Sequence, residues 1–133
     1  MPTGFDVETG SNLSQKLAEI APRLAEYLKR CRIAGKVTPD SPVTAADLCD
    51  VINSREDAGA KVQGPDIRAM VNYLRRSKAP IGSGANGYFW ATDIKELGPT
   101  IVHMMERRDA IQSAITGLES SFEPRVSGQM SLF

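Results

Sequence analysis

Apolar residues in the first third of the chain recur at steps of three and four, which predicts a helix. Pro22 suits the first turn of a helix better than its middle, so we expect the main helix at 22–32 with a short helical turn before it. The cluster Pro39-Asp40-Ser41-Pro42 ends this segment. The apolar series consists of Leu13, Leu17, Ile20, Leu24, Leu28 and Cys31.

Two further helices are predicted from their start signals. Thr44 is an N-cap residue followed by an acid at Asp47, which favours a helix over 44–53. Gly64-Pro65-Asp66 predicts a helix over 65–77, because proline at the first helical position followed by an acid is a start signal. The apolar face of the first contains Leu48, Val51 and Ile52, and that of the second contains Ile67, Met70, Val71 and Leu74.

A short β-hairpin is predicted after these helices. Asn86-Gly87 is a strong hairpin-turn dipeptide, and Tyr88, Phe89 and Trp90 favour strands. We expect strands near 79–82 and 88–91. Because side chains alternate along a strand, one of Phe89 and Trp90 should point inward.

A long helix is predicted over 92–122, with Thr92-Asp93 as its cap and a kink or restart at Gly98-Pro99. Its apolar residues form a heptad-like stripe, interrupted by Arg108. The stripe either pairs with its twin in a homodimer through 97–122, or folds back on the first helix and completes a monomeric core. Its residues are Ile94, Leu97, Ile101, Met104, Ile111, Ile115, Leu118 and Phe122.

The two end segments, 1–11 and 123–133, lack this periodicity, and we expect flexible tails there. A folded domain is expected over 12–91, followed by the long helix over 92–122. The expected fold class is therefore mainly α with a small β-hairpin, that is, α+β.

Composition limits the class of protein. The chain has 133 residues, and its 16 Lys and Arg balance 16 Asp and Glu, so any nucleic-acid site must be a local patch. No apolar run is long enough for a membrane span, and the first residues lack the pattern of a secretory signal, so we expect a cytoplasmic protein with no membrane partner. Two cysteines and one histidine argue against a disulfide framework or a zinc site. Cys31 and Cys49 are expected to be reduced and buried.

Segment 61–78 contains five basic residues and a single acidic one, Asp66, which gives it a local net charge of +4. The bases are Lys61, Arg68, Arg75, Arg76 and Lys78. On a helix, Arg68, Asn72 and Arg75 share one face because they are spaced by four and three. A solvated outer face of an amphipathic helix is the alternative explanation.

The order helix, helix, helix, hairpin over 22–91 resembles the winged helix-turn-helix family. The string from Asp66 to Arg76, followed by the Gly-rich hairpin, also resembles small DNA-associated proteins of phages and prophages. The resemblance implies duplex DNA as a partner, with helix 65–77 in the major groove and a wing tip at Gly82–Gly87 on the flanking backbone. It implies base contacts from Arg68, Asn72 and Arg75, phosphate contacts from Lys61, Arg76 and Lys78, and wing contacts from Ser83 and Asn86.

The last five residues are Gln129, Met130, Ser131, Leu132 and Phe133. They resemble the pentapeptide by which bacterial and phage replication and repair proteins bind the DNA polymerase sliding clamp, with Met130 where Leu is commoner. The resemblance implies that Leu132 and Phe133 fill a hydrophobic pocket, that Gln129 forms a hydrogen bond at its rim, and that Met130 adapts to a shallow site. A chance match, with Phe133 packed on the domain, is the alternative.

Catalytic signatures are absent from the sequence, which contains no P-loop, G-x-S-x-G or H-E-x-x-H motif. Gly82-Ser-Gly-Ala-Asn-Gly matches G-x-G-x-x-G but joins two strands instead of opening a helix, so we interpret it as wing flexibility. We therefore expect a non-enzymatic protein without cofactor or metal, acting in DNA replication in a bacterial or phage-infected cell. The alternatives are a homodimeric transcription regulator and a protein–protein adaptor that does not touch DNA.

Overall fold

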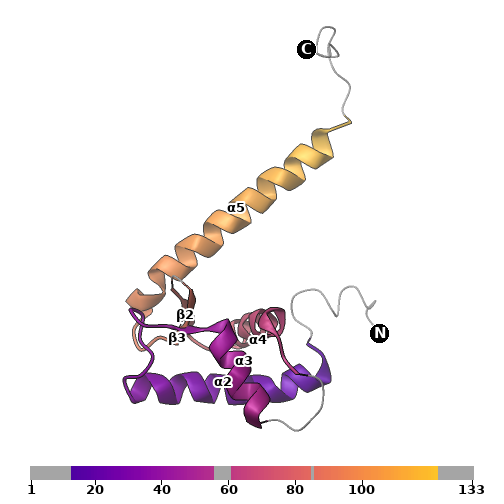
Figure 1. Ribbon diagram of the computed structural model, residues 1–133. Helices are drawn as coiled ribbons and strands as arrows, with labels where there is room; N and C mark the ends of the chain where they lie inside the picture. The colour runs from indigo at the N-terminus through magenta and orange to yellow at the C-terminus, as the bar shows by residue number, and fades with distance from the viewer. Residues whose placement is uncertain (1–12, 56–60, 85, 123–133) are drawn as a thin grey trace. The chain divides into compact units, whose positions relative to one another are not determined.

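The computed structural model describes residues 13–55, 61–84 and 86–122 of the chain. The chain divides into two units, one ending at Thr100 and the other beginning at Ile101. Its described part is mainly helical, with a small three-stranded antiparallel sheet and a long C-terminal helix (Figure 1). This content agrees with the expected α+β class. The elements are α2 (Gln15–Ile33), β1 (Val43–Thr44), α3 (Ala45–Arg55), α4 (Gly64–Arg76), β2 (Ile81–Ser83), β3 (Gly87–Trp90), the 3-10 helix η1 (Ile94–Leu97) and α5 (Gly98–Ser120).

Helix α2 is continuous from Gln15 to Ile33, so the prediction of a helix starting at Pro22 was wrong. Ser14 caps the helix, since its side chain accepts a hydrogen bond from the Leu17 N–H at 3.2 Å. Pro22 is exposed within the helix, and its missing N–H removes only one bond of the helical ladder. Burial of Ile20 and Leu24 on either side of Pro22 outweighs that local loss.

Helices α3 and α4 start where the sequence indicates. The Thr44 hydroxyl accepts from the Asp47 N–H at 3.1 Å, which caps α3. Asp66 accepts from the Gln63 N–H at 2.9 Å and so caps α4. The Asn53 amide bonds both backbone groups of Val62, at 2.9 and 3.0 Å, and ties the end of α3 to the residues just before α4.

The sheet has the strand order β1-β3-β2. Strand β1 was not predicted, because its two residues are too short to produce an alternation. It pairs Val43 with Tyr88 and Thr44 with Gly87, and β2 pairs Gly82 with Phe89. Of the two neighbouring aromatic residues, Phe89 is buried and Trp90 is half-buried, so the predicted alternation is confirmed.

The expected wing tip at Gly82–Gly87 is shorter in the structure, because both end glycines belong to paired strands. A Cβ on Gly82 would lie 2.3 Å from the Phe89 ring, and one on Gly87 would lie 2.3 Å from the Val43 carbonyl oxygen. These two glycines therefore allow close packing, which corrects the interpretation that they supply flexibility.

The core of the first unit lies between α2, α3 and α4, which Figure 1 shows packed together. Helix α4 buries Ile67, Met70, Val71 and Leu74, as the stripe predicts. Against them lie Ile20, Leu24 and Leu28 of α2 together with Leu48 of α3. A second cluster contains Cys31, Val37, Phe89 and Ala91 and joins α2 to the sheet.

Arg32 connects the end of α2 to the segment that follows the sheet. Its guanidinium donates two hydrogen bonds to the Glu96 carboxylate, at 2.8 and 2.9 Å, and one to the Trp90 carbonyl oxygen at 3.0 Å. The Thr92 N–H also donates to Glu96 at 2.9 Å. These hydrogen bonds lower the pKa of Glu96 from 4.5 to about 2. The bonds from Arg32 have the largest effect, and the bond from the Thr92 N–H has the second largest.

The second unit contains the rest of α5, from Ile101 onward. The helix starts anew at Gly98 after the 3-10 turn, as the Gly98-Pro99 pair indicates. Every residue from 101 to 119 is exposed, including the apolar ones. No helix in the described part of the chain combines the length and the apolar character that crossing a membrane requires.

We predict that Glu96 makes the stability of the first unit depend on acid pH. Because its pKa is lower in the folded state than in the unfolded one, its contribution is complete above about pH 4.5 and is lost as the pH falls through about 2. Thermal unfolding from pH 2 to 6 should show a Glu96→Gln variant that is less stable than the parent above pH 4.5, with a gap that closes toward pH 2.

Glu26→Gln is the matched control, since Glu26 pairs with Arg30 on the exposed surface of α2 and should have little effect. A stability gap for Glu96→Gln that stays constant over the whole pH range would contradict the prediction.

Candidate nucleic-acid interface

The outer face of α4 carries three exposed polar residues spaced by four. Arg68, Asn72 and Arg76 lie on this face, opposite the buried stripe. The spacing of four places their side chains one above another along the helix. We call Arg68, Asn72 and Arg76 the α4 face.

The Arg75 side chain, expected on one helix face with Arg68 and Asn72, is bonded to the sheet. It is half-buried, and its Nε donates to the Ile81 carbonyl oxygen at 2.8 Å. Its Nη2 lies 3.5 Å from the Ser83 hydroxyl. The guanidinium is therefore used to attach α4 to β2, and Arg76 takes its place on the outer face.

Ser83 is also held in place within the first unit. Its N–H donates to the Thr100 hydroxyl at 2.9 Å, and that hydroxyl donates to the Ser83 carbonyl oxygen at 3.2 Å. Thr100 is buried, with 4% of its surface exposed. Sequence reasoning missed Thr100, because nothing local relates it to a strand 17 residues earlier. Asn86 is exposed, in the short connection between β2 and β3.

Lys61 and Lys78 lie at the two ends of α4, and both are exposed. Lys61 precedes the helix, and Lys78 follows it in the turn to β2. Lys78 has a positive φ of 75°, a left-handed conformation that side-chain-bearing residues rarely adopt. The two lysines extend the positive charge of the α4 face beyond both ends of the helix.

The charge of the α4 face is not neutralised by its neighbours. Arg68 and Arg76 form no ion pair or side-chain hydrogen bond with any residue in the described ranges. The single acid of the region, Asp66, is engaged in capping α4. This face therefore carries two exposed positive charges, an arrangement that favours a polyanion.

The five residues of the expected clamp-binding peptide, Gln129 to Phe133, lie outside the described residues. The same holds for the two expected tails, 1–11 and 123–133.

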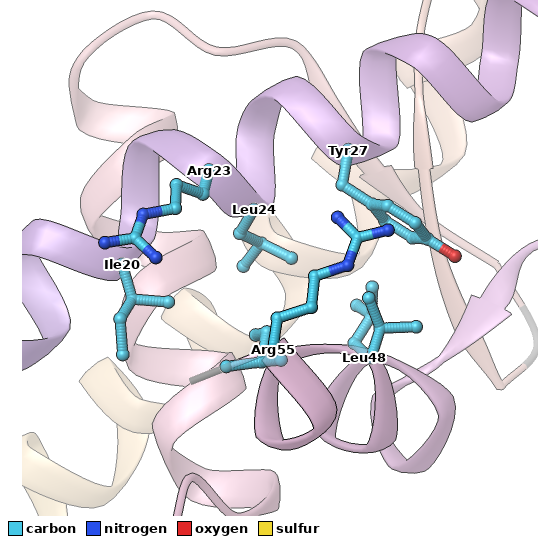
Figure 2. A pocket seen from close by; sticks show the side chains of 8 residues that line it. Ile20, Arg23, Leu24, Tyr27, Leu48 and Arg55 are labelled. Atoms are coloured by element: carbon cyan, nitrogen blue, oxygen red, sulfur yellow. The ribbon is translucent and has the colours of Figure 1, made fainter. Parts of the chain in front are cut away.

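A separate pocket of about 60 Å³ lies between α2 and α3. Figure 2 shows the side chains that line it, among them Ile20, Leu24 and Leu48, with Arg55 extending between them toward Tyr27. The Arg55 guanidinium lies 5.8 Å from the centre of the Tyr27 ring, a cation–π contact. The pocket is far smaller than typical ligand sites of roughly 300–1,000 Å³, and none of its lining residues comes from α4 or the sheet.

Reactive groups in the described part of the chain are not assembled into a centre. Cys31 is buried and Cys49 is half-buried, and both are free thiols. Burial raises the pKa of the Cys49 thiol, which reduces the thiolate fraction available for chemistry. His103 is exposed on α5. Within the described ranges, no three His, Cys, Asp or Glu residues cluster in a way that could hold a metal ion.

Comparisons with models of protein families, with curated proteins and with solved structures found no match for this chain.

We predict that Arg75 stabilises the fold, whereas Arg68 does not. Arg75→Ala removes the donor to the Ile81 carbonyl oxygen and should cost about 1–3 kcal/mol of unfolding free energy. Arg68→Ala, on the exposed side of the same helix, should stay within about 0.5 kcal/mol. Urea unfolding of both variants measures this difference, and equal effects would mean that the contact between Arg75 and β2 contributes little.

Proposed function

We propose that the first unit is a winged helix-turn-helix domain that binds duplex DNA through the α4 face. We further propose that the C-terminal pentapeptide docks the protein on a DNA polymerase sliding clamp, so that it acts without catalysis in bacterial or phage DNA replication.

The order of elements supports the winged-helix part of the proposal. Helix, strand, helix, helix and a two-stranded hairpin follow one another from α2 to β3. The single strand β1 pairs with β3 of the hairpin, which gives a three-stranded sheet with the order β1-β3-β2. In winged-helix domains, the helix before the hairpin is the one that enters the major groove, and here that helix is α4.

The observation that carries DNA binding is the positive charge of the α4 face, which no ion pair in the described ranges neutralises. Arg68 and Asn72 are residue types that form bidentate contacts with guanine and adenine. Arg76, Lys61 and Lys78 extend the charge toward positions where phosphates would lie. The chain as a whole has no net charge. A concentration of basic residues on the outer face of one helix therefore favours a polyanionic partner over a face that is merely solvated.

The clamp part of the proposal depends on the sequence Gln129 to Phe133. A short peptide of this kind binds through a few anchors, here Leu132 and Phe133. Attachment to a clamp that encircles DNA would raise the effective concentration of the α4 face near the duplex. The two weak interactions would therefore reinforce one another.

DNA binding is tested by fluorescence anisotropy of a labelled duplex with the full chain. A double variant, Arg68→Ala with Arg76→Ala, should bind at least about tenfold more weakly. Its dependence on salt should also be shallower, by about 0.9 in the slope of log K against log salt for each phosphate that the variant no longer neutralises.

The matched control is Lys29→Ala with Arg30→Ala, which removes the same charge from the exposed surface of α2. If both double variants lose affinity equally, the effect is one of total charge and the α4 face is not the site. If the parent chain does not bind duplex DNA at low salt, DNA binding is excluded and the adaptor interpretation takes its place.

Clamp binding is tested by titrating a purified bacterial sliding clamp with the full chain. The parent should bind saturably with micromolar affinity, and Leu132→Ala with Phe133→Ala should abolish binding while leaving affinity for DNA unchanged. Arg125→Ala with Val126→Ala, upstream in the same segment, is the control and should bind like the parent. Absence of binding by the parent would reduce the pentapeptide to a coincidence of sequence.

A further inference from the structure

The pocket between α2 and α3 combines an apolar interior with two arginines. Arg23 and Arg55 line it, and both are exposed. Tyr27 and Val51, which also line it, are half-buried. No acidic residue of the described ranges is among the lining residues, so the charges that line the pocket are positive. Its buried lining residues, which belong to the core, are Ile20, Leu24, Leu48 and Ile52.

The volume of the pocket, about 60 Å³, limits what can enter it. A cavity needs roughly 10–15 Å³ to hold one water molecule, and an engineered apolar cavity of roughly 150 Å³ binds benzene. The pocket between α2 and α3 falls between these sizes. It therefore has space for one aliphatic side chain, such as that of leucine or valine, and is too small for a nucleotide or a cofactor.

Two helices line the pocket over matching lengths. The lining residues of α2 run from Ile20 to Tyr27, and those of α3 run from Leu48 to Arg55. Each stretch covers two helical turns, which is about 10 Å along the helix axis. A surface of this length is contacted by a short peptide segment, which inserts one side chain between the helices and leaves its neighbours at the edge.

Arg55 is held across the pocket in a position that suits a carboxylate. Its guanidinium lies 5.8 Å from the centre of the Tyr27 ring, and Figure 2 shows the side chain extending from α3 toward that ring on α2. None of the ion pairs between described residues involves Arg55. A guanidinium that stacks on a ring keeps its N–H donors at its edge, where a carboxylate accepts two parallel hydrogen bonds.

We propose that this pocket docks an acidic peptide segment of a partner protein. One aliphatic side chain of the peptide enters the pocket, and carboxylates on either side of it pair with Arg55 and Arg23. The aliphatic anchor supplies affinity because it leaves water, whereas the carboxylates fix the position of the peptide. None of the lining residues belongs to the α4 face, so this docking does not use the side chains that we propose for DNA binding.

The chemistry of the partner is tested by selection from a random-peptide library displayed on phage, with the full chain as bait. Peptides that also bind a Val51→Phe variant are removed, because the added ring fills the pocket from the half-buried position of Val51. We expect the remaining peptides to share a leucine, isoleucine or valine flanked by aspartate or glutamate. A selection that leaves no peptide, or leaves basic ones, overturns the proposal.

The residues that bind the peptide are tested by fluorescence anisotropy of one selected, labelled peptide with variants of the full chain. Arg23→Ala with Arg55→Ala should weaken binding at least about tenfold, because both carboxylate partners are lost. Arg68→Ala with Arg76→Ala is the matched control, since it removes the same charge from the α4 face and should leave the affinity unchanged. A peptide with alanine in place of its aliphatic anchor should also bind at least about tenfold more weakly.

Equal losses for the two double variants would mean that an acidic peptide is attracted to positive charge in general, and this overturns the proposal. A second copy of the chain is the other occupant to exclude. If sedimentation equilibrium shows a dimer that Val51→Phe converts to monomers, the pocket belongs to that dimer and the proposal is wrong. Thermal unfolding checks that Val51→Phe is folded, and the arginine variants decide the matter if it is not.

These outcomes are separable from those of the proposed function. DNA binding is measured with variants of Arg68 and Arg76, and clamp binding with variants of Leu132 and Phe133. Loss of either activity leaves the pocket between α2 and α3 intact, and loss of peptide binding leaves the α4 face intact.

Discussion

Burial of one side of α4 against α2 is the constraint on which the rest of the first unit depends. Ile67, Met70, Val71 and Leu74 are each worth roughly 1.5–3 kcal/mol when removed from water, which together is comparable to the whole stability of a small domain. Rotation of the helix by one residue, about 100°, would move Arg68 toward the core. The outward direction of the α4 face is thus fixed by the apolar residues opposite it and needs no contact of its own.

Much of this arrangement could be predicted from the sequence, because the relevant signals are local. Thr44 and Asp66 indicate the starts of α3 and α4, and the spacing of Ile67 to Leu74 identifies the buried side. The alternation of Phe89 and Trp90 correctly indicates that one of them is buried. The exposure of Arg68, Asn72 and Arg76 follows from the same periodicity once the buried stripe is known.

The features that escaped prediction depend on residues distant in sequence. Pro22 locally indicates a helix start, but the core on both sides of it keeps α2 continuous. Strand β1 exists only because Val43 and Thr44 meet β3, more than forty residues later. Arg75 is one residue from Arg76, yet the nearby Ile81 carbonyl turns it toward the sheet and away from the outer face. Sequence periodicity assigns faces well, but it does not identify the partner of an individual polar side chain.

The left-handed backbone of Lys78 has a consequence for how this surface can change. A side-chain-bearing residue in that conformation costs roughly 1 kcal/mol relative to glycine. Glycine would therefore relax the turn between α4 and β2, but it would also remove a positive charge from the end of the α4 face. At this position, conformational ease and surface charge cannot be improved together. At Lys78, a substitution that relieves backbone strain would therefore weaken the attraction for the DNA partner that we propose.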